Sequence, residues 1–334
     1  MQSITQIPGV LAAHATNEEG GTGCTVLVFP QGAVGAVDVR GGAPATRETD
    51  LLRPEETVQV LHSVVLSGGS AYGLAASCGV AEELERAGMG INVGVGVVPI
   101  VSSACLFDLV VGDPYARPTA ADGAAATRAA LAQQDVPATE RKPLAQGNVG
   151  AGTGCSVGKL CGPWRSMKAG LGESVQVAGD VVCGAVAAVN ALGGVVDPQT
   201  GQPIAGLLSR DGSGIVDVVD TALGFIDGTV EDDPDGLSWL RANTTISCVV
   251  TNAKLTKAQA TKVAQMSADA YAHTIRPVHT TNDGDTVFVA CTGEVDCHVD
   301  VVGMLATRAL EQAIANAAYN AEAAYGLKAA RDFK

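Results

Sequence analysis

The sequence predicts an α/β protein in which layers of sheet are covered by Ala-rich helices. Hydrophobic residues make up 47% of the 334 residues and charged residues 17%, which provides a sizeable core and excludes a disordered chain. Aromatic residues contribute only 4%, whereas glycine contributes 41 residues. Segments rich in Val and Gly alternate with Ala-rich segments. Such small side chains allow the close approach of backbones that layered packing requires.

The first half of the chain is expected to contain short strands and two helices. Hydrophobic spacing, with Gly and Pro as breaks, defines these elements. In order they are two strands within 22–39 around the turn Pro30-Gln31-Gly32, a helix over 74–84 that ends at Gly88, a buried strand over 91–101, and an Ala-rich helix over 122–133.

The second half is expected to contain a β-rich block, a loop and a final α/β portion. The stretch 196–243 has many acidic residues with interspersed Gly, Pro and Ser, which predicts a solvated, poorly packed loop. Around it the expected elements are strands within 147–159, 167–177 and 180–189, a strand over 246–251, a helix over 256–275 with Thr256 as N-cap, a strand over 285–292, and a closing helix over 305–325.

Charge and composition narrow the possible partners and the compartment. The formal net charge of −14 repels phosphate backbones and argues against a nucleic-acid partner. The nine cysteines are odd in number and lie mostly in apolar runs, which favours buried free thiols over disulfides or a metal framework. The N-terminal residues resemble no secretory signal, and the apolar run 91–101 is shorter than the roughly 20 residues of a membrane span. We therefore expect a cytoplasmic protein that contacts neither membrane nor nucleic acid.

The Gly-rich segment Ser67 to Gly73 does not match a phosphate-binding loop. It lacks the GxxxxGK[ST] pattern, and as a dinucleotide fingerprint it departs at the second glycine. A tight strand-to-helix turn accounts for it. A substrate-lining role for Ser70 and Tyr72 stays open, and no cofactor is expected.

Histidine-based hydrolysis is poorly supported. The five histidines of the sequence form neither HExxH nor another metal-ligand pattern, so no partner histidine for a serine nucleophile is indicated. No metal is therefore expected.

A threonine after the acidic stretch offers a different chemistry. Asn243-Thr244-Thr245 lies where the acidic segment meets a predicted buried strand, although Asn-Thr-Thr is also an ordinary turn. A threonine Oγ can attack the preceding carbonyl in an N→O acyl shift, and hydrolysis of the ester then frees an α-amine. That amine has a pKa of about 7.7–8.0 in model peptides, so it can act as base for the same hydroxyl.

At this point the chain resembles the self-processing β-peptidyl aminopeptidase/D-aminopeptidase family, which includes the nylon-oligomer hydrolases. The two most specific motifs are Asn243-Thr244-Thr245-Ile246 and His279 to Thr286. Weaker matches are Gly41-Gly42, Leu66 to Leu74, Val101 to Ala104 and Gly152 to Cys155. The resemblance implies a four-layer αββα sandwich of the N-terminal-nucleophile hydrolase type, formed by residues 1–334 as a single domain.

The resemblance also implies self-cleavage and a set of site residues. Cleavage between Asn243 and Thr244 would give an α chain of residues 1–243 and a β chain of residues 244–334, with Thr244 as nucleophile. By position, Lys159 matches the active-site lysine of the family and Asn190 its oxyanion-stabilising asparagine. Without the resemblance, Lys159 would be taken for an ordinary surface lysine.

Two further positions distinguish branches of the family. Asp283 and Asp285 match the acidic pair of the nylon-oligomer branch, where aminopeptidase members carry a Ser and a Glu. Taken alone, Asp-Gly-Asp is a common turn. Phe107 stands where some members have a tyrosine, so a hydroxyl contact to the oxyanion or substrate is not transferred, and Tyr115 does not obviously replace it. Phe107 is kept as a residue that lines the substrate site.

The sequence thus predicts a self-activated, cytoplasmic amidohydrolase that acts on small amine-bearing amides. Expected substrates are D- or β-aminoacyl peptides and amides, or linear 6-aminohexanoate oligomers. Acyl transfer of the ornithine-acetyltransferase type and an uncleaved binding or scaffold protein of the same fold are the alternatives. The resemblance further implies a homo-oligomer of αβ units.

Overall fold

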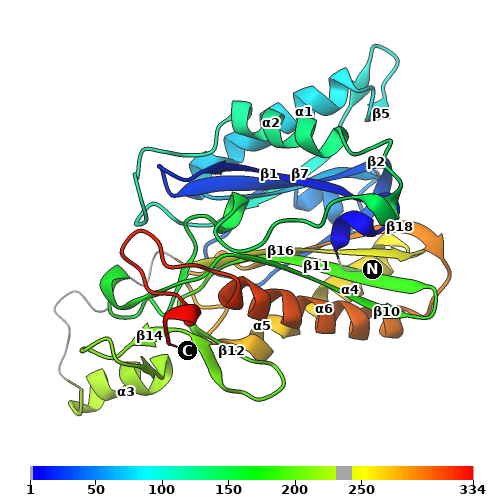
Figure 1. The fold of residues 1–334 in the computed structure, drawn as a ribbon. Helices are drawn as coiled ribbons and strands as arrows, with labels where there is room; N and C mark the ends of the chain where they lie inside the picture. Colours follow the sequence, from blue (N-terminus) through cyan, green and yellow to red (C-terminus); the bar gives the residue numbers. More distant parts are fainter. Residues whose placement is uncertain (1–2, 231–242, 334) are drawn as a thin grey trace.

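The computed structural model describes residues 3–230 and 243–333. Two sheets lie face to face between two layers of helix (Figure 1). One outer layer consists of α1 (Ala76–Arg86) and α2 (Ala120–Leu131). The opposite outer layer consists of α4 (Lys257–Ser267), α5 (Asp269–Thr274) and α6 (Val299–Tyr319). The predicted αββα sandwich is confirmed.

One long strand connects the two sheets. The strand β2 (Thr22–Val39) pairs through its first half with β1 (Leu11–Asn17) and β4 (Leu61–Ser67), and through Val34 to Val39 with β18 (Thr286–Val295). The prediction of two strands around Pro30-Gln31-Gly32 was wrong. The turn-forming residues shift the register with β4 between Val28 and Ala33, and the chain continues without reversing direction.

The remaining strands extend the sheets on either side of β2. The first sheet continues from β4 to β7 (Val101–Cys105) and β3 (Ala45–Arg47). The second continues from β18 to β16 (Thr244–Ala253), β11 (Val181–Asn190) and β10 (Leu171–Ala178). Every residue of β11 and β16 is buried, as expected for strands covered on both faces.

Small residues set the spacing between helix α6 and the sheet below it. A Cβ atom on Gly172 of β10 would lie 2.1 Å from the carbonyl oxygen of Ala313 and 2.3 Å from the nitrogen of Ala317. The helix backbone therefore lies directly on the strand, which accounts for the Ala-rich sequence of α6. This helix begins and ends about six residues before the range predicted for it.

The predicted helix over 256–275 is confirmed in outline. Thr256 caps α4 with a capping box, in which Gln259 Oε1 accepts from the Thr256 N–H at 2.9 Å. At Ala268 the helix divides into α4 and α5.

The prediction of a buried strand over 91–101 was wrong. Residues Ile91–Asn92 (β5) and Val97–Val98 (β6) form a short surface hairpin, and Val95 at its tip is 99% exposed. Gly94 has a φ of 87° and reverses the chain in the middle of the apolar run. The buried strand β7 begins only at Val101.

The prediction of a poorly packed loop over 196–243 was wrong for the part that the structure describes; residues 231–242 lie outside it. Acidic side chains here cap local structure, as when Asp217 accepts from the N–H groups of Val219 and Asp220 at the start of α3 (Val218–Asp227). Buried Leu207 and Val218 pack with Leu160 and Cys161. The strands of this region are β12 (Gly194–Val196), β13 (Pro203–Ala205), β14 (Leu207–Leu208) and β15 (Ile215–Val216), and β12 also pairs with β17 (Ile275–Arg276).

Further short elements include the 3-10 helices Ser70–Ala75 and Gly150–Gly152 and the strands β8 (Ser156–Val157) and β9 (Met167–Lys168). Seven of the nine cysteines are buried, as predicted. Within the described ranges, no helix has the length and apolar character needed to cross a membrane.

Candidate active site

Three strand ends bring the predicted site residues together. Thr244 begins β16, and the antiparallel register of β11 places Asn190, its last residue, directly opposite Thr244. On its other side β16 pairs in parallel with β18, whose first residue Thr286 follows Asp283 and Asp285. The same edge of the sheet therefore carries Thr244, Asn190 and the acidic pair.

The hydroxyl of Thr244 lies against the carbonyl that it would attack. Its Oγ1 is in hydrogen-bond contact with the carbonyl oxygen of Asn243. The N–H of Gly284 points to both atoms, 3.2 Å from Thr244 Oγ1 and 3.3 Å from Asn243 O. A Cβ on Gly284 would lie 2.8 Å from Thr244 Oγ1, so glycine is needed for this approach.

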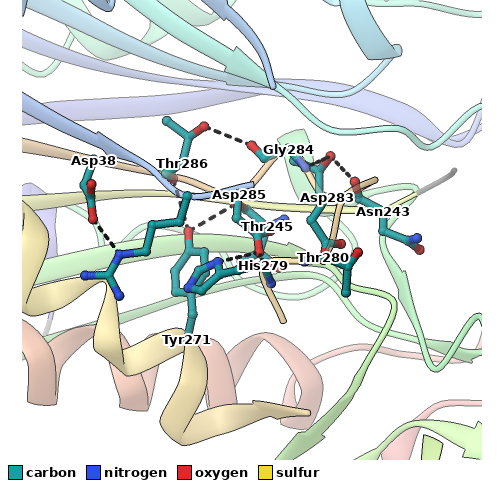
Figure 2. A network of polar contacts seen from close by, with 12 residues as sticks. Asp38, Asn243, Thr245, Tyr271, His279, Thr280, Asp283, Gly284, Asp285 and Thr286 are labelled. Atoms are coloured by element: carbon teal, nitrogen blue, oxygen red, sulfur yellow. Dashed lines mark hydrogen bonds and ion pairs between the residues drawn. The ribbon is translucent and has the colours of Figure 1, made fainter. Parts of the chain in front are cut away.

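The carboxylate of Asp285 is held by three N–H groups. Its Oδ1 accepts from the N–H of Thr245 at 2.7 Å, and its Oδ2 accepts from His279 through the backbone N–H at 3.1 Å and Nδ1 at 2.9 Å. Figure 2 shows Asp285 between Thr245 and His279. Both oxygens of this carboxylate are thus occupied.

The carboxylate of Asp283 accepts fewer hydrogen bonds than that of Asp285. Its Oδ2 accepts from the N–H of Thr280 at 2.6 Å, while its buried Oδ1 has no hydrogen-bond partner among the described residues. Burial, and then the charge of Asp285, raise the pKa of Asp283 above its ordinary value. The turn interpretation of Asp-Gly-Asp therefore describes the backbone but not these two buried side chains.

The segment that begins with Gly41-Gly42 packs against the backbone of the acidic pair. The carbonyl of Asp283 accepts from the N–H of Ala43 at 2.8 Å, and that of Asp285 accepts from Gly41 at 3.3 Å. A Cβ on Gly41 would lie 2.2 Å from the carbonyl oxygen of Asp283. Glycine is therefore required where β2 ends against this loop.

Lys159 is not a surface lysine. It is 2% exposed, and its Nζ donates to the backbone oxygen and to Oδ1 of Asn190, both at 2.8 Å. Burial lowers the pKa of Lys159 to about 7, against an upward effect of Cys155, Asp283, Asp108 and Asp285. The site therefore contains a buried amine that titrates near neutrality.

Asn190 joins the two sheets at the site. Its Nδ2 donates to the carbonyl oxygen of Phe107 at 2.7 Å, and its Oδ1 also accepts from the N–H of Ser156 at 3.1 Å. These contacts fix the orientation of the amide.

The three predicted lining residues differ in their positions. Phe107 is half-buried and reaches the site through the hydrogen bond of its carbonyl to Asn190. Ser70 has a φ of 54°, and its N–H donates to the carbonyl of Leu106. Tyr72 is 61% exposed, and its ring packs against the guanidinium of Arg117 at 3.8 Å. The contacts described for Ser70 and Tyr72 do not include Thr244.

Two residues beside the acidic pair were not predicted from the sequence. Tyr271 in α5 is fully buried, and His279 stacks on its ring with centroids 5.6 Å apart. His279 belongs to the motif that carries the resemblance, but a lone histidine has no spacing pattern that signals a role. In the part of the chain that the structure describes, no group of three or more His, Cys, Asp or Glu residues could hold a metal ion.

Comparison with known families decides the relationship. The profile of peptidase family S58 matches residues 2–331. The chain belongs to peptidase family S58. This assignment makes it an amide-bond hydrolase and confirms the resemblance seen in the sequence.

Relatives and solved structures of family S58 agree with this assignment. The chain is 40% identical over 314 residues to an uncharacterized aminopeptidase of Mycobacterium leprae, covering 89% of this chain and 80% of that protein. It is 32% identical over 292 residues to the 6-aminohexanoate-oligomer endohydrolase of Paenarthrobacter ureafaciens, covering 86% and 74%.

Two solved structures share the fold. A β-aminopeptidase of Burkholderia sp. superposes with a TM-score of 0.65 at 19% identity, covering 98% of this chain and 90% of that one. The L-aminopeptidase D-Ala-esterase/amidase of Ochrobactrum anthropi, described as a variant of the Ntn hydrolase fold, gives a TM-score of 0.67 at 18% identity, covering 96% and 86%. At such identities the likeness establishes the fold alone.

Proposed function

We propose that this member of family S58 is a self-activated amidohydrolase with Thr244 as its nucleophile. The observation that carries the proposal is the contact of Thr244 Oγ1 with the Asn243 carbonyl, together with the Gly284 N–H that points to both atoms. A hydroxyl beside a carbonyl whose oxygen faces an N–H donor is arranged for intramolecular acyl transfer.

Self-cleavage would proceed in two balanced steps. Thr244 Oγ attacks the carbonyl carbon of Asn243, the bond from this carbon to the Thr244 nitrogen breaks, and the hydroxyl proton passes to the departing nitrogen. Water then hydrolyses the ester, which leaves a carboxylate on Asn243 and returns the hydroxyl to Thr244. The new α-amine stands beside its own hydroxyl and can act as base in later turnovers.

The neighbouring side chains suit turnover by the mature site. Asn190 Nδ2 would donate to the oxyanion of a substrate, a contribution of about 2.7–4 kcal/mol in comparable sites. In its protonated form, Lys159 would lower the proton affinity of the Thr244 hydroxyl. Asp283 would hold the new ammonium of Thr244 through its Oδ1, and Asp285 would orient the backbone at Thr245.

We propose small amine-bearing amides as substrates. The acidic pair matches the nylon-oligomer branch, and a relative at 32% identity is named a 6-aminohexanoate-oligomer endohydrolase. Linear 6-aminohexanoate oligomers, and D- or β-aminoacyl peptides and amides, are therefore the substrates to compare. Amine acceptors added to the same assays would separate hydrolysis from acyl transfer.

The decisive experiment follows maturation. Denaturing electrophoresis of the purified wild type should show two chains, and N-terminal sequencing of the smaller should begin Thr-Thr-Ile-Ser. Thr244→Ala should leave one full-length chain without amidase activity, because no hydroxyl is left to attack. Thr244→Ser is the matched control, since it keeps a hydroxyl and should still cleave.

Processing and turnover by Thr244→Ala would exclude Thr244 as nucleophile. A wild type that stays intact and inactive would instead favour the binding or scaffold alternative.

A further inference from the structure

His279 is held through both its backbone and its side chain. Its φ is 58°, in the left-handed region that Asn, Asp and His tolerate better than most residues. In this conformation its backbone N–H and its Nδ1 both reach the same oxygen, Asp285 Oδ2, at 3.1 and 2.9 Å. Main chain and side chain of one residue therefore hold one carboxylate oxygen.

The imidazole ring rests on an anchored aromatic ring. It stacks on Tyr271 with an interplanar angle of 22°. The Tyr271 hydroxyl lies 3.2 Å from the carbonyl of Thr245, 2.9 Å from Ser247 Oγ and 3.1 Å from the carbonyl of Thr286. The ring beneath His279 is thereby fixed to the first residues of β16 and β18 (Figure 2).

The carboxylate that His279 holds contacts the residue after the nucleophile. Asp285 Oδ1 accepts from the N–H of Thr245 at 2.7 Å. An ionised carboxylate can only accept hydrogen bonds, so the hydrogen between Asp285 and His279 belongs to Nδ1. A continuous path of two hydrogen bonds thus runs from His279 through Asp285 to the backbone beside Thr244.

We propose that His279 is a positioning residue for the nucleophile: its Nδ1–H fixes the Asp285 carboxylate against Thr245 and so sets the backbone of Thr244. The proposal rests on the proposed role of Thr244. The proposal also assigns different functions to the two aspartates. Asp285 is fully engaged by His279 and Thr245, and Asp283 keeps a carboxylate oxygen for the new ammonium.

Two substitutions of equal size test the donor. Asn and Asp both tolerate the left-handed backbone at position 279, but only Asn offers an N–H near the place of Nδ1. We expect His279→Asn to keep at least about one third of the wild-type kcat. His279→Asp, which faces Asp285 with a second carboxylate, should lose at least about tenfold in kcat with KM within about twofold.

His279→Phe provides an independent comparison, because it keeps the ring on Tyr271 but removes the donor. It should resemble His279→Asp in kcat and in the rate of cleavage at Asn243. The matched control is His273→Asn: His273 lies in α5, is exposed, and pairs with Glu311 away from the acidic pair. It should leave both rates unchanged.

All rates are measured per folded molecule, with thermal melting as a check on folding. Equal kcat values for His279→Asn and His279→Asp, or wild-type rates in His279→Phe, would overturn the role of the donor. If His279→Asp or His279→Phe does not fold, a kcat for His279→Asn below one tenth of wild type overturns it equally. If the proposed role of Thr244 as nucleophile is wrong, the maturation experiment shows it separately, as an uncut wild type or an active Thr244→Ala.

Discussion

Asp283 and Asp285 flank one glycine, but their carboxylate oxygens have different hydrogen-bond partners. Asp283 Oδ1 is buried without a partner among the described residues, and the pKa of this carboxyl is raised by burial and by Asp285. Only the ionised form can accept an N–H from the Thr244 ammonium. Turnover should therefore fall as the pH falls through the pKa of Asp283.

We predict that Asp283→Asn lowers kcat/KM by at least about tenfold, equal to 1.4 kcal/mol, and makes the acid limb of the pH profile less steep, because the Thr244 amine is then the one group of the two that still has to lose a proton. The buried site places this limb above the ordinary aspartate value of about 3.9. The new Thr244 ammonium lowers the pKa of Asp283, so the change in steepness of the limb, and not its midpoint, identifies the group. An acid limb that persists unchanged in Asp283→Asn would assign it to another residue.

At the scale of elements, the site depends on how closely β2 approaches the loop before β18. A Cβ on Gly41 would lie 2.2 Å from Asp283 O and 2.4 Å from Asp285 N, and both are backbone atoms. Gly41→Ala must therefore displace the acidic loop, at a cost of about 1–3 kcal/mol in stability. We expect it to slow both self-cleavage and turnover by at least about tenfold.

Gly96→Ala is the matched control for this substitution. No atom lies within 4 Å of the Cβ that would be added at Gly96 in the β5–β6 hairpin. It should cleave and turn over like the wild type. Wild-type rates in Gly41→Ala would show that the loop tolerates movement and that the close approach is not needed.

The elements that could be predicted from the sequence are those whose pattern is local. Thr256 and Gln259 form a capping box within four residues, and the buried run after Thr244 has no break. The prediction of a buried strand over 91–101 failed because a Val-rich run has the same composition whether it is buried or exposed. Here Gly94 turns the chain and makes the run an exposed hairpin. The prediction of a loop failed for the described part of 196–243 because acidic side chains can cap local structure as well as face solvent.

Apart from Thr244, the site residues were predictable only through the resemblance. Asn190 and Thr244 are 54 positions apart, and only the register of β11 with β16 makes them neighbours. Burial of Lys159 depends on the sheet edge around it, which no local pattern encodes. The contacts of His279 with Asp285 and of Tyr271 with the strand ends arise only in the folded chain, so neither residue was singled out from the sequence.

At the scale of the whole molecule, the proposed cleavage would cut a chain whose parts are interleaved. The β chain would begin with β16, which pairs on one side with β11 of the α chain and on the other with β18 of its own chain. On its far side β18 pairs with β2 of the α chain. Helix α6 of the β chain also packs on β10 and β11. The α and β chains could therefore separate only by breaking two strand pairings and exposing the core between them.

We predict that the two chains co-elute as one species on native gel filtration and separate only in denaturant. The reason is that cleavage breaks one peptide bond at the start of β16 and leaves the pairing of Asn190 with Thr244, and of β18 with β2, in place. Uncut Thr244→Ala is the control and should elute at the same volume. Elution of the 244–334 chain on its own in native buffer would contradict the interleaved arrangement, because the ten-residue strand β16, buried at every position, would then face water along the edge that β11 now covers.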